Sequence, residues 1–145
     1  MINIRKYNPS DLESLADLMN DLGYPVSIEV MGRRMELIES NPSYLTFVAT
    51  INEAVTGMIG IRQLLNYETD DLVTQISSLV TKSDFQGQGV GSALIKFIED
   101  WAVQNGSSVL YLTSGIKQER LKAHEFYKKY GFEITGYRFI KKINI

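Results

Sequence analysis

The sequence predicts an α/β (α+β) fold, with a mixed, mostly antiparallel central sheet and helices on both faces. Two helical patterns near the N-terminus are followed by strand patterns joined by short polar turns, which is typical of antiparallel hairpins. A long amphipathic helix then separates two further strand patterns, as in a strand–helix–strand unit. All three prolines lie within the first 42 residues, so none interrupts the strands and helices that follow.

The N-terminal part is predicted to hold one strand and two helices. Residues 2–7 form the strand, and the Asn-Pro-Ser segment at 8–10 supplies capping residues and a proline suited to a first helical turn. Apolar residues then recur at helical spacing until Gly23, and a second helix is predicted from Ser27.

Strand patterns dominate the middle of the chain. Residues 44–51 and 54–65 are rich in β-branched and aromatic side chains, and the Asn-Glu pair between them predicts a hairpin turn. A third strand is predicted at 72–81, after a polar loop. The remaining predicted elements are a helix at 89–104, a strand at 108–113, a helix at 119–130 and a terminal strand from Phe132.

The composition excludes several kinds of site. The chain has 145 residues, of which 44% are hydrophobic, and this length suits a single domain over residues 1–145. It has no cysteine and one histidine, His124, which excludes disulfides, thiolate metal sites and a His-rich metal cluster, so we expect no metal. The net charge of −2 argues against nucleic acid as a partner. Without an apolar run of about 18 residues or a signal-like start, we expect no membrane partner and a cytoplasmic protein.

Charge is divided unevenly along the chain. From Ile116 to the end there are eight basic and three acidic residues, whereas the first 75 residues hold eleven acidic and five basic ones. These charges are either solvated faces, or they favour an anionic ligand at the C-terminal part and a cationic amine at the N-terminal part. Tyrosines at positions 24, 44 and 67 are candidates to line an acceptor pocket there, and the alternative for each is a core or loop aromatic.

A glycine-rich loop lies between the third predicted strand and the long helix. Residues 86–91 read Gln-Gly-Gln-Gly-Val-Gly, and glycines allow tight turns and close backbone approach. The start of the following helix offers unpaired N–H groups and a positive dipole end, which together suit a phosphate or pyrophosphate. The Lys-Ser/Thr pair of a P-loop is absent, and the glycine spacing differs from that of dinucleotide-binding loops. The alternative is a glycine-rich turn that binds nothing.

Two motifs in register resemble the GNAT (GCN5-related N-acetyltransferase) family. The pattern Gln86-x-x-Gly89-x-Gly91 matches the family's Q/R-x-x-G-x-G/A segment, and residues 123–132 (AHEFYKKYGF) are similar to its A-x-x-F-Y-x-x-x-G-F segment. One strand separates the two motifs, as in the family. The resemblance implies a GNAT-like acyl-coenzyme A N-acyltransferase fold, with acetyl-coenzyme A as co-substrate.

The resemblance also implies which residues hold acetyl-coenzyme A. Backbone amides of the glycine loop and the helix start would wrap its pyrophosphate, and the end of the preceding strand would pair with its pantetheine arm. Arg120, Lys117 and Lys122 are candidates to pair with its phosphates, unless they are only a solvated basic helix start. The implied binding residues are Leu79, Val80, Thr81, Gln86, Gly87, Gln88, Gly89, Val90, Gly91, Ser92 and Arg120.

Tyr127 is the candidate catalytic residue. On the predicted helix, Ala123, Phe126, Tyr127 and Tyr130 fall at i, i+3, i+4 and i+7, so Tyr127 points into the protein. From the residues alone, an ordinary core tyrosine is the alternative. The resemblance implies that its phenol is the general acid that protonates the departing thiolate. His124, beside the same apolar stripe, is interpreted as a surface or packing residue.

The general base is not identified by the sequence. Many family members place a glutamate on the strand before the glycine loop, but residues 75–78 are Gln-Ile-Ser-Ser. A free alkylamine is mostly protonated at neutral pH, so some group must accept its proton. One candidate is a water molecule that passes the proton on through Ser77 or Ser78. The other is a carboxylate, either from the first helices or from Glu68, Asp70 or Asp71.

Three functions remain from these observations, and the last in rank is a nucleotide-binding protein of another fold. The first is an N-acetyltransferase that moves the acetyl group directly to a primary amine, of a small molecule or a peptide, in a ternary complex. The alternative is a catalytically silent acyl-coenzyme A-binding sensor or interaction module, which the missing strand glutamate favours. The resemblance leaves room for a homodimer.

Overall fold

A computed structural model describes residues 1–115 and 118–143. The chain divides into two compact units after Leu110, each with its own packing. In chain order, the described residues form β1 (Ile2–Lys6), α1 (Leu12–Leu22), α2 (Ile28–Ser40), β2 (Tyr44–Ile51), β3 (Ala54–Leu65), β4 (Leu72–Thr81), α3 (Val90–Gln104), β5 (Val109–Leu112) and α4 (Leu121–Lys129). Short 3-10 turns precede α1, α3 and α4, at Pro9–Asp11, Ser83–Phe85 and Gln118–Arg120.

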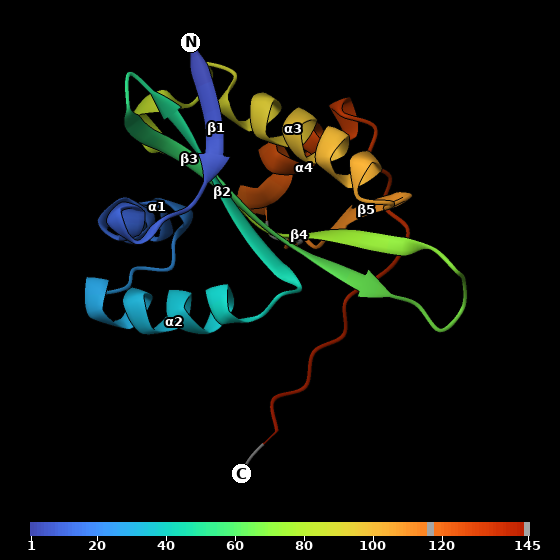
Figure 1. Ribbon diagram of the computed structural model, residues 1–145. Coiled ribbons are helices and arrows are strands. Elements are labelled where there is room, and N and C mark those ends of the chain that lie inside the picture. The colour runs from blue at the N-terminus through green and yellow to red at the C-terminus, as the bar shows by residue number, and fades with distance from the viewer. Residues whose placement is uncertain (116–117, 144–145) are drawn as a thin grey trace. The chain divides into compact units, whose positions relative to one another are not determined.

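The strands lie in the order β1-β2-β3-β4-β5, and β1 to β4 pair antiparallel (Figure 1). The turn between β2 and β3 has φ of 50° at Asn52 and 68° at Glu53, and positive φ at both central residues matches the twist of the flanking strands. The predicted hairpin is therefore confirmed, and so is the predicted mixed sheet carrying helices.

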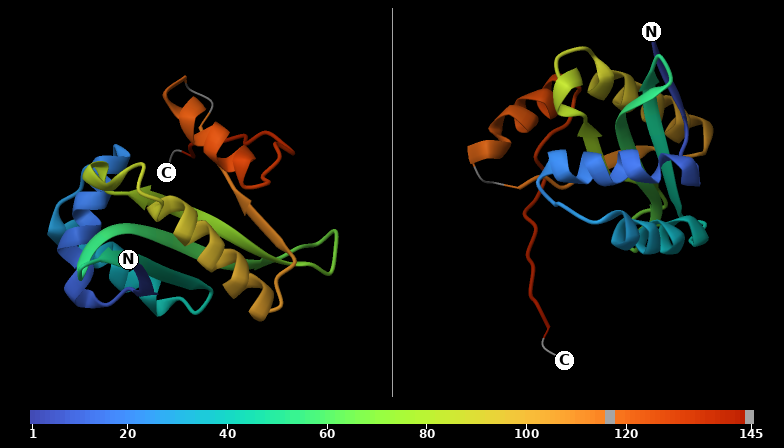
Figure 2. Two further views of the ribbon diagram at one scale, coloured as in Figure 1. Left: turned by 90° about the horizontal axis from the view of Figure 1, so that it is seen from above. Right: turned by 90° about the vertical axis from the view of Figure 1, so that its left-hand side faces the viewer.

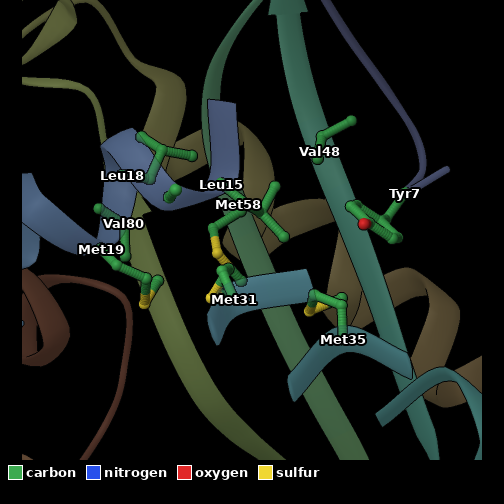
Figure 3. Close-up of a cluster of buried hydrophobic side chains, with 10 residues drawn as sticks. Tyr7, Leu15, Leu18, Met19, Met31, Met35, Val48, Met58 and Val80 are labelled. Atoms are coloured by element: carbon green, nitrogen blue, oxygen red, sulfur yellow. The ribbon is translucent and has the colours of Figure 1, made fainter. Parts of the chain in front are cut away.

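Helices cover both faces of the sheet within residues 1–110. α1 and α2 lie on one face and α3 on the other (Figures 1 and 2). Side chains alternate along each strand accordingly. Val48 and Met58 belong to a buried cluster with side chains of α1 and α2 (Figure 3), whereas the ring of Phe47 contacts Phe97 of α3, with 5.0 Å between centroids.

The N-terminus of α1 is fixed by charged and capping groups. Asp11, which is buried, accepts two hydrogen bonds from the guanidinium of Arg5, at 2.7 and 2.8 Å. It also accepts one from the N–H of Asn8 at 3.0 Å, while the Asn8 side chain accepts from the N–H of Ser10. Neighbouring Arg5 holds the pKa of Asp11 below its usual range. The helix then ends at Gly23, whose φ is 102°, as the sequence predicts.

The predicted terminal strand from Phe132 is wrong. Residues 132–143 contain neither helix nor strand, and after the half-buried Phe132 their apolar side chains are exposed: Ile134, Tyr137, Phe139, Ile140 and Ile143. Apolar residues and β-branched side chains make a segment compatible with a strand, but a strand forms only beside a partner that pairs with its backbone. The predicted helix at 119–130 is also shorter, because its first turn is a 3-10 turn.

No helix among residues 1–115 and 118–143 is both long and apolar enough to cross a lipid bilayer.

Candidate functional site

The glycine loop carries the chain from β4 into α3. After Thr81, the N–H of Lys82 donates to the carbonyl of Thr56 at 2.8 Å, which fixes the loop's start to β3. Gly87 and Gly89 have φ of 81° and 88°. An L-residue in this left-handed region is strained, so the loop's course depends on these two glycines.

The N-terminus of α3 fits an oxyanion. Its N-cap residue is Gly89, and within the described residues no side chain caps it. The first turn also lacks an acidic residue, so nothing in it opposes the positive end of the helix dipole. A helix start of this kind suits a phosphate or pyrophosphate group.

A close contact fixes this helix start against the sheet. A Cβ atom added to Gly57 of β3 would lie 2.7 Å from Cγ1 of Val90 and 2.9 Å from the carbonyl oxygen of Val80. Both Val80 and Val90 are buried. The absence of a side chain at position 57 therefore lets the first turn of α3 approach the end of β4.

β4 carries a bulge near its middle. Gly60 pairs with Ser78 and Ile61 pairs with Ile76, so Ser77 is an extra residue without a partner on β3. A bulge of this kind bends the strand and is common beside active sites. Ser77 is exposed and Ser78 is half-buried.

A row of polar side chains crosses three strands near this bulge. Arg62 of β3 pairs in register with Tyr44 of β2 and with Gln75 of β4. The Nε–H of Arg62 donates to Oε1 of Gln75, and its Nη1 lies 3.4 Å from the hydroxyl of Tyr44. From the sequence, Tyr44 is a candidate to line the acceptor pocket, whereas Arg62 is not. The available signal was that Arg62 is the one Lys or Arg between positions 35 and 81.

In the second unit, Tyr127 of α4 lies among aromatic rings. Its ring centroid is 5.7 Å from that of Phe126 and 5.9 Å from that of Phe132. Burial raises the pKa of the Tyr127 phenol, while the positive charge of Arg120 acts in the opposite direction. The phenol is therefore protonated at neutral pH, as a proton donor must be.

Other predicted residues of this unit have surface or packing positions. A ring nitrogen of His124 lies 2.8 Å from the carbonyl oxygen of Gly115, in agreement with a packing interpretation. Lys122 is exposed, and Lys117 lies outside the described residues. Among the residues that the structure describes, no group of three or more potential metal ligands comes together.

A family model described as the acetyltransferase (GNAT) family matches residues 12–132. The chain belongs to the GNAT family. It is 30% identical over 127 residues to an uncharacterized N-acetyltransferase of Bacillus subtilis, and the match covers 87% of both chains. It is also 30% identical over 126 residues to an aminoalkylphosphonate N-acetyltransferase of Salmonella typhimurium, covering 87% of this chain and 78% of the relative. The structure of a GNAT family acetyltransferase from Staphylococcus aureus has the same fold, with a TM-score of 0.84, 23% identity and 98% coverage of both chains.

Within this GNAT domain, most residues predicted to bind acetyl-coenzyme A form one continuous stretch. It runs from the end of β4 at Leu79–Thr81, through the loop, to Ser92 in the first turn of α3. Arg120 and Tyr127 belong to the second unit, where the charge of Arg120 acts on the Tyr127 phenol. The binding and catalytic roles of all these residues stay predictions.

Proposed function

We propose that this protein is an acetyl-coenzyme A-dependent N-acetyltransferase that transfers the acetyl group directly to a primary amine in a ternary complex. The observation that carries the proposal is the start of α3 at Gly89, which no side chain of the described residues caps, reached through two glycines with positive φ. In a chain of the GNAT family, this is the expected place for the pyrophosphate of coenzyme A.

The proposed binding site for acetyl-coenzyme A uses backbone groups. N–H groups from Gln86 to Ser92 would bind its pyrophosphate. Leu79–Thr81 pair with β3 along one edge, and the pantetheine arm would take their other edge, because extended amide chains add to strand edges. Arg120 would contribute a charged partner for a phosphate.

Two of the chain's own groups would move protons. As the amine nitrogen forms a bond to the acetyl carbon and the carbon–sulfur bond breaks, Tyr127 donates its phenolic proton to the departing sulfur. The amine nitrogen gives its proton to a water held by Ser77 or Ser78 at the β4 bulge. A solvent proton then restores the Tyr127 phenol, and the products are the acetamide and the free thiol.

Thiol release from acetyl-coenzyme A tests the proposal. The chain has no cysteine, so a thiol-reactive dye reports the product without background from the protein. The acceptor panel holds polyamines, lysine peptides, peptides with free N-termini and, because of the Salmonella relative's name, aminoalkylphosphonates. We expect release that depends on one class of amine. Silence across the panel, with coenzyme A still bound in calorimetry, would favour the sensor or interaction module. Silence without binding would contradict the proposed co-substrate.

A further inference from the structure

Arg62 lies on the face of the sheet that α1 and α2 cover. Along regular pairing, Tyr44 and Arg62 are on the same face as Val48 and Met58, which pack in the cluster beneath those helices (Figure 3). The bulge at Ser77 keeps Gln75 on this face too, as its contact with Arg62 shows.

Among the described residues, the partners of the Arg62 guanidinium are neutral. It donates to the amide oxygen of Gln75 and approaches the hydroxyl of Tyr44, whose ring centroid lies 5.9 Å from its Cζ. In the described part of the chain, no carboxylate lies within ion-pair distance of it. These contacts leave other N–H groups of the Arg62 guanidinium available for further hydrogen bonds. The half-buried side chain is thus held in place with its charge uncompensated.

The strand position beside this cation on the same face carries no side chain, because it is Gly60. Gly60 is the next β3 residue on that face after Met58, and a Cβ atom built on Gly60 would meet only the end of Met58 at 3.7 Å and Cβ of Ser78 at 4.0 Å. No atom of α1 or α2 lies within that range. Gly60 and Arg62 are two residues apart, so their positions are separated by about 7 Å along the strand.

We propose that Arg62 binds the anionic group of the acetyl acceptor, so that the acceptor is a short-chain amine carrying a phosphonate, carboxylate or sulfonate. This inference rests on the proposed acetyltransferase function. The guanidinium fork matches oxyanions of this kind. A short alkyl chain over Gly60 brings the amine to Ser78, next to the residues of β4 proposed to pair with the pantetheine arm, Leu79–Thr81.

A matched amine series tests this assignment in the thiol-release assay. Its anionic members are 2-aminoethylphosphonate, β-alanine and taurine. Its neutral member is 3-aminopropan-1-ol, in which a hydroxymethyl group replaces the anionic group. We expect the KM of the best anionic amine to lie well below that of the neutral one. In Arg62→Gln that KM should rise roughly ten- to a hundred-fold, the loss expected for charge-assisted hydrogen bonds, with kcat and the neutral amine little changed. Arg62→Lys should recover part of the affinity.

The control variant is Arg33→Gln, which removes an exposed guanidinium from α2 and should leave every KM unchanged. Equal KM values for charged and neutral amines, or an Arg62→Gln variant that is folded by circular dichroism yet kinetically normal, would overturn the assignment. So would weaker coenzyme A binding in Arg62→Gln with no effect on the amines.

If no amine is turned over, the proposed function fails, and the assignment is decided separately. Calorimetry then measures the binding of 2-aminoethylphosphonate, β-alanine and taurine to wild type and to Arg62→Gln with coenzyme A present. Binding of at least one of them that Arg62→Gln abolishes supports the anion site, whereas binding that is absent or equal in the two proteins rejects it.

Discussion

Gly57 of β3 and Val90 of α3 approach so closely that a Cβ atom on Gly57 would lie 2.7 Å from Cγ1 of Val90. Gly57 pairs with Thr81, the last residue of β4 before the glycine loop, and Val90 is the first residue of α3 after it. The close approach sets the distance between the sheet and the helix start proposed to bind the pyrophosphate.

Gly57→Ala should destabilise the fold. The added methyl group meets the backbone oxygen of Val80 as well as Val90, so both the start of α3 and the backbone of β4 must shift, and overpacking of this kind costs about 1–3 kcal/mol. Chemical denaturation measures the free energy of unfolding. The matched control is Gly136→Ala, where a Cβ atom meets nothing within 4 Å and the change should stay within about 0.5 kcal/mol. A Gly57→Ala variant as stable as wild type would contradict the close approach.

Gly89→Ala should weaken coenzyme A binding. Position 89 has a φ of 88°, and forcing alanine into the left-handed region costs roughly 1–2 kcal/mol, so the loop would relax and move its N–H groups. We expect the Kd from calorimetry to rise about ten-fold, the equivalent of about 1.4 kcal/mol. Gly136→Ala again serves as the control. Unchanged affinity in a folded Gly89→Ala variant would argue against the loop as the pyrophosphate site.

Tyr127→Phe should lower turnover while leaving coenzyme A affinity little changed. The variant keeps the ring contacts with Phe126 and Phe132 and removes only the hydroxyl, so the loss reports proton donation. We expect kcat to fall roughly ten- to a thousand-fold, near the usual range for acid–base groups. Tyr137→Phe, which changes an exposed tyrosine of the same unit, should have wild-type kcat. A fully active Tyr127→Phe variant would show that Tyr127 is only a packing residue.

Local pattern predicted the hairpin strands to the residue. β2, β3 and β4 begin and end as expected, because β-branched and aromatic runs were bounded by turn residues. The position of the glycine loop was predictable for a similar reason. The positive φ at Gly87 and Gly89 is a property of the local backbone that favours glycine. The terminal strand was predicted by the same reasoning and is wrong, because a strand depends on a partner that its own sequence does not describe.

The row of Tyr44, Arg62 and Gln75 could not be predicted in this way. It depends on the register of three strands, and the register between β3 and β4 shifts at the bulge of Ser77. With regular pairing beyond Ser78, Gln75 would point to the other face of the sheet. No local pattern marks that shift, so a single basic residue in a strand pattern gave no indication of its partners.

The Arg5–Asp11 pair should make stability depend on pH in the acid range. The Arg5 hydrogen bonds lower the folded-state pKa of Asp11, so the unfolded chain takes up a proton first as the pH falls. The stabilisation is fully present when the pH is above the pKa of Asp11 in the unfolded chain, about 3.9. It is lost as the pH falls through the lower pKa of Asp11 in the folded protein.

Asp11→Asn should therefore cost stability at neutral pH and progressively less below about pH 4. The variant weakens both the ion pair and the bond to the Asn8 N–H, and we expect a loss of about 1–2 kcal/mol. Urea denaturation of both proteins between neutral pH and pH 3 measures the difference. Asp17→Asn, in an exposed position of α1, is the control and should follow wild type. A difference between Asp11→Asn and wild type that stays constant down to pH 3 would show that the pair does not contribute through the charge of Asp11.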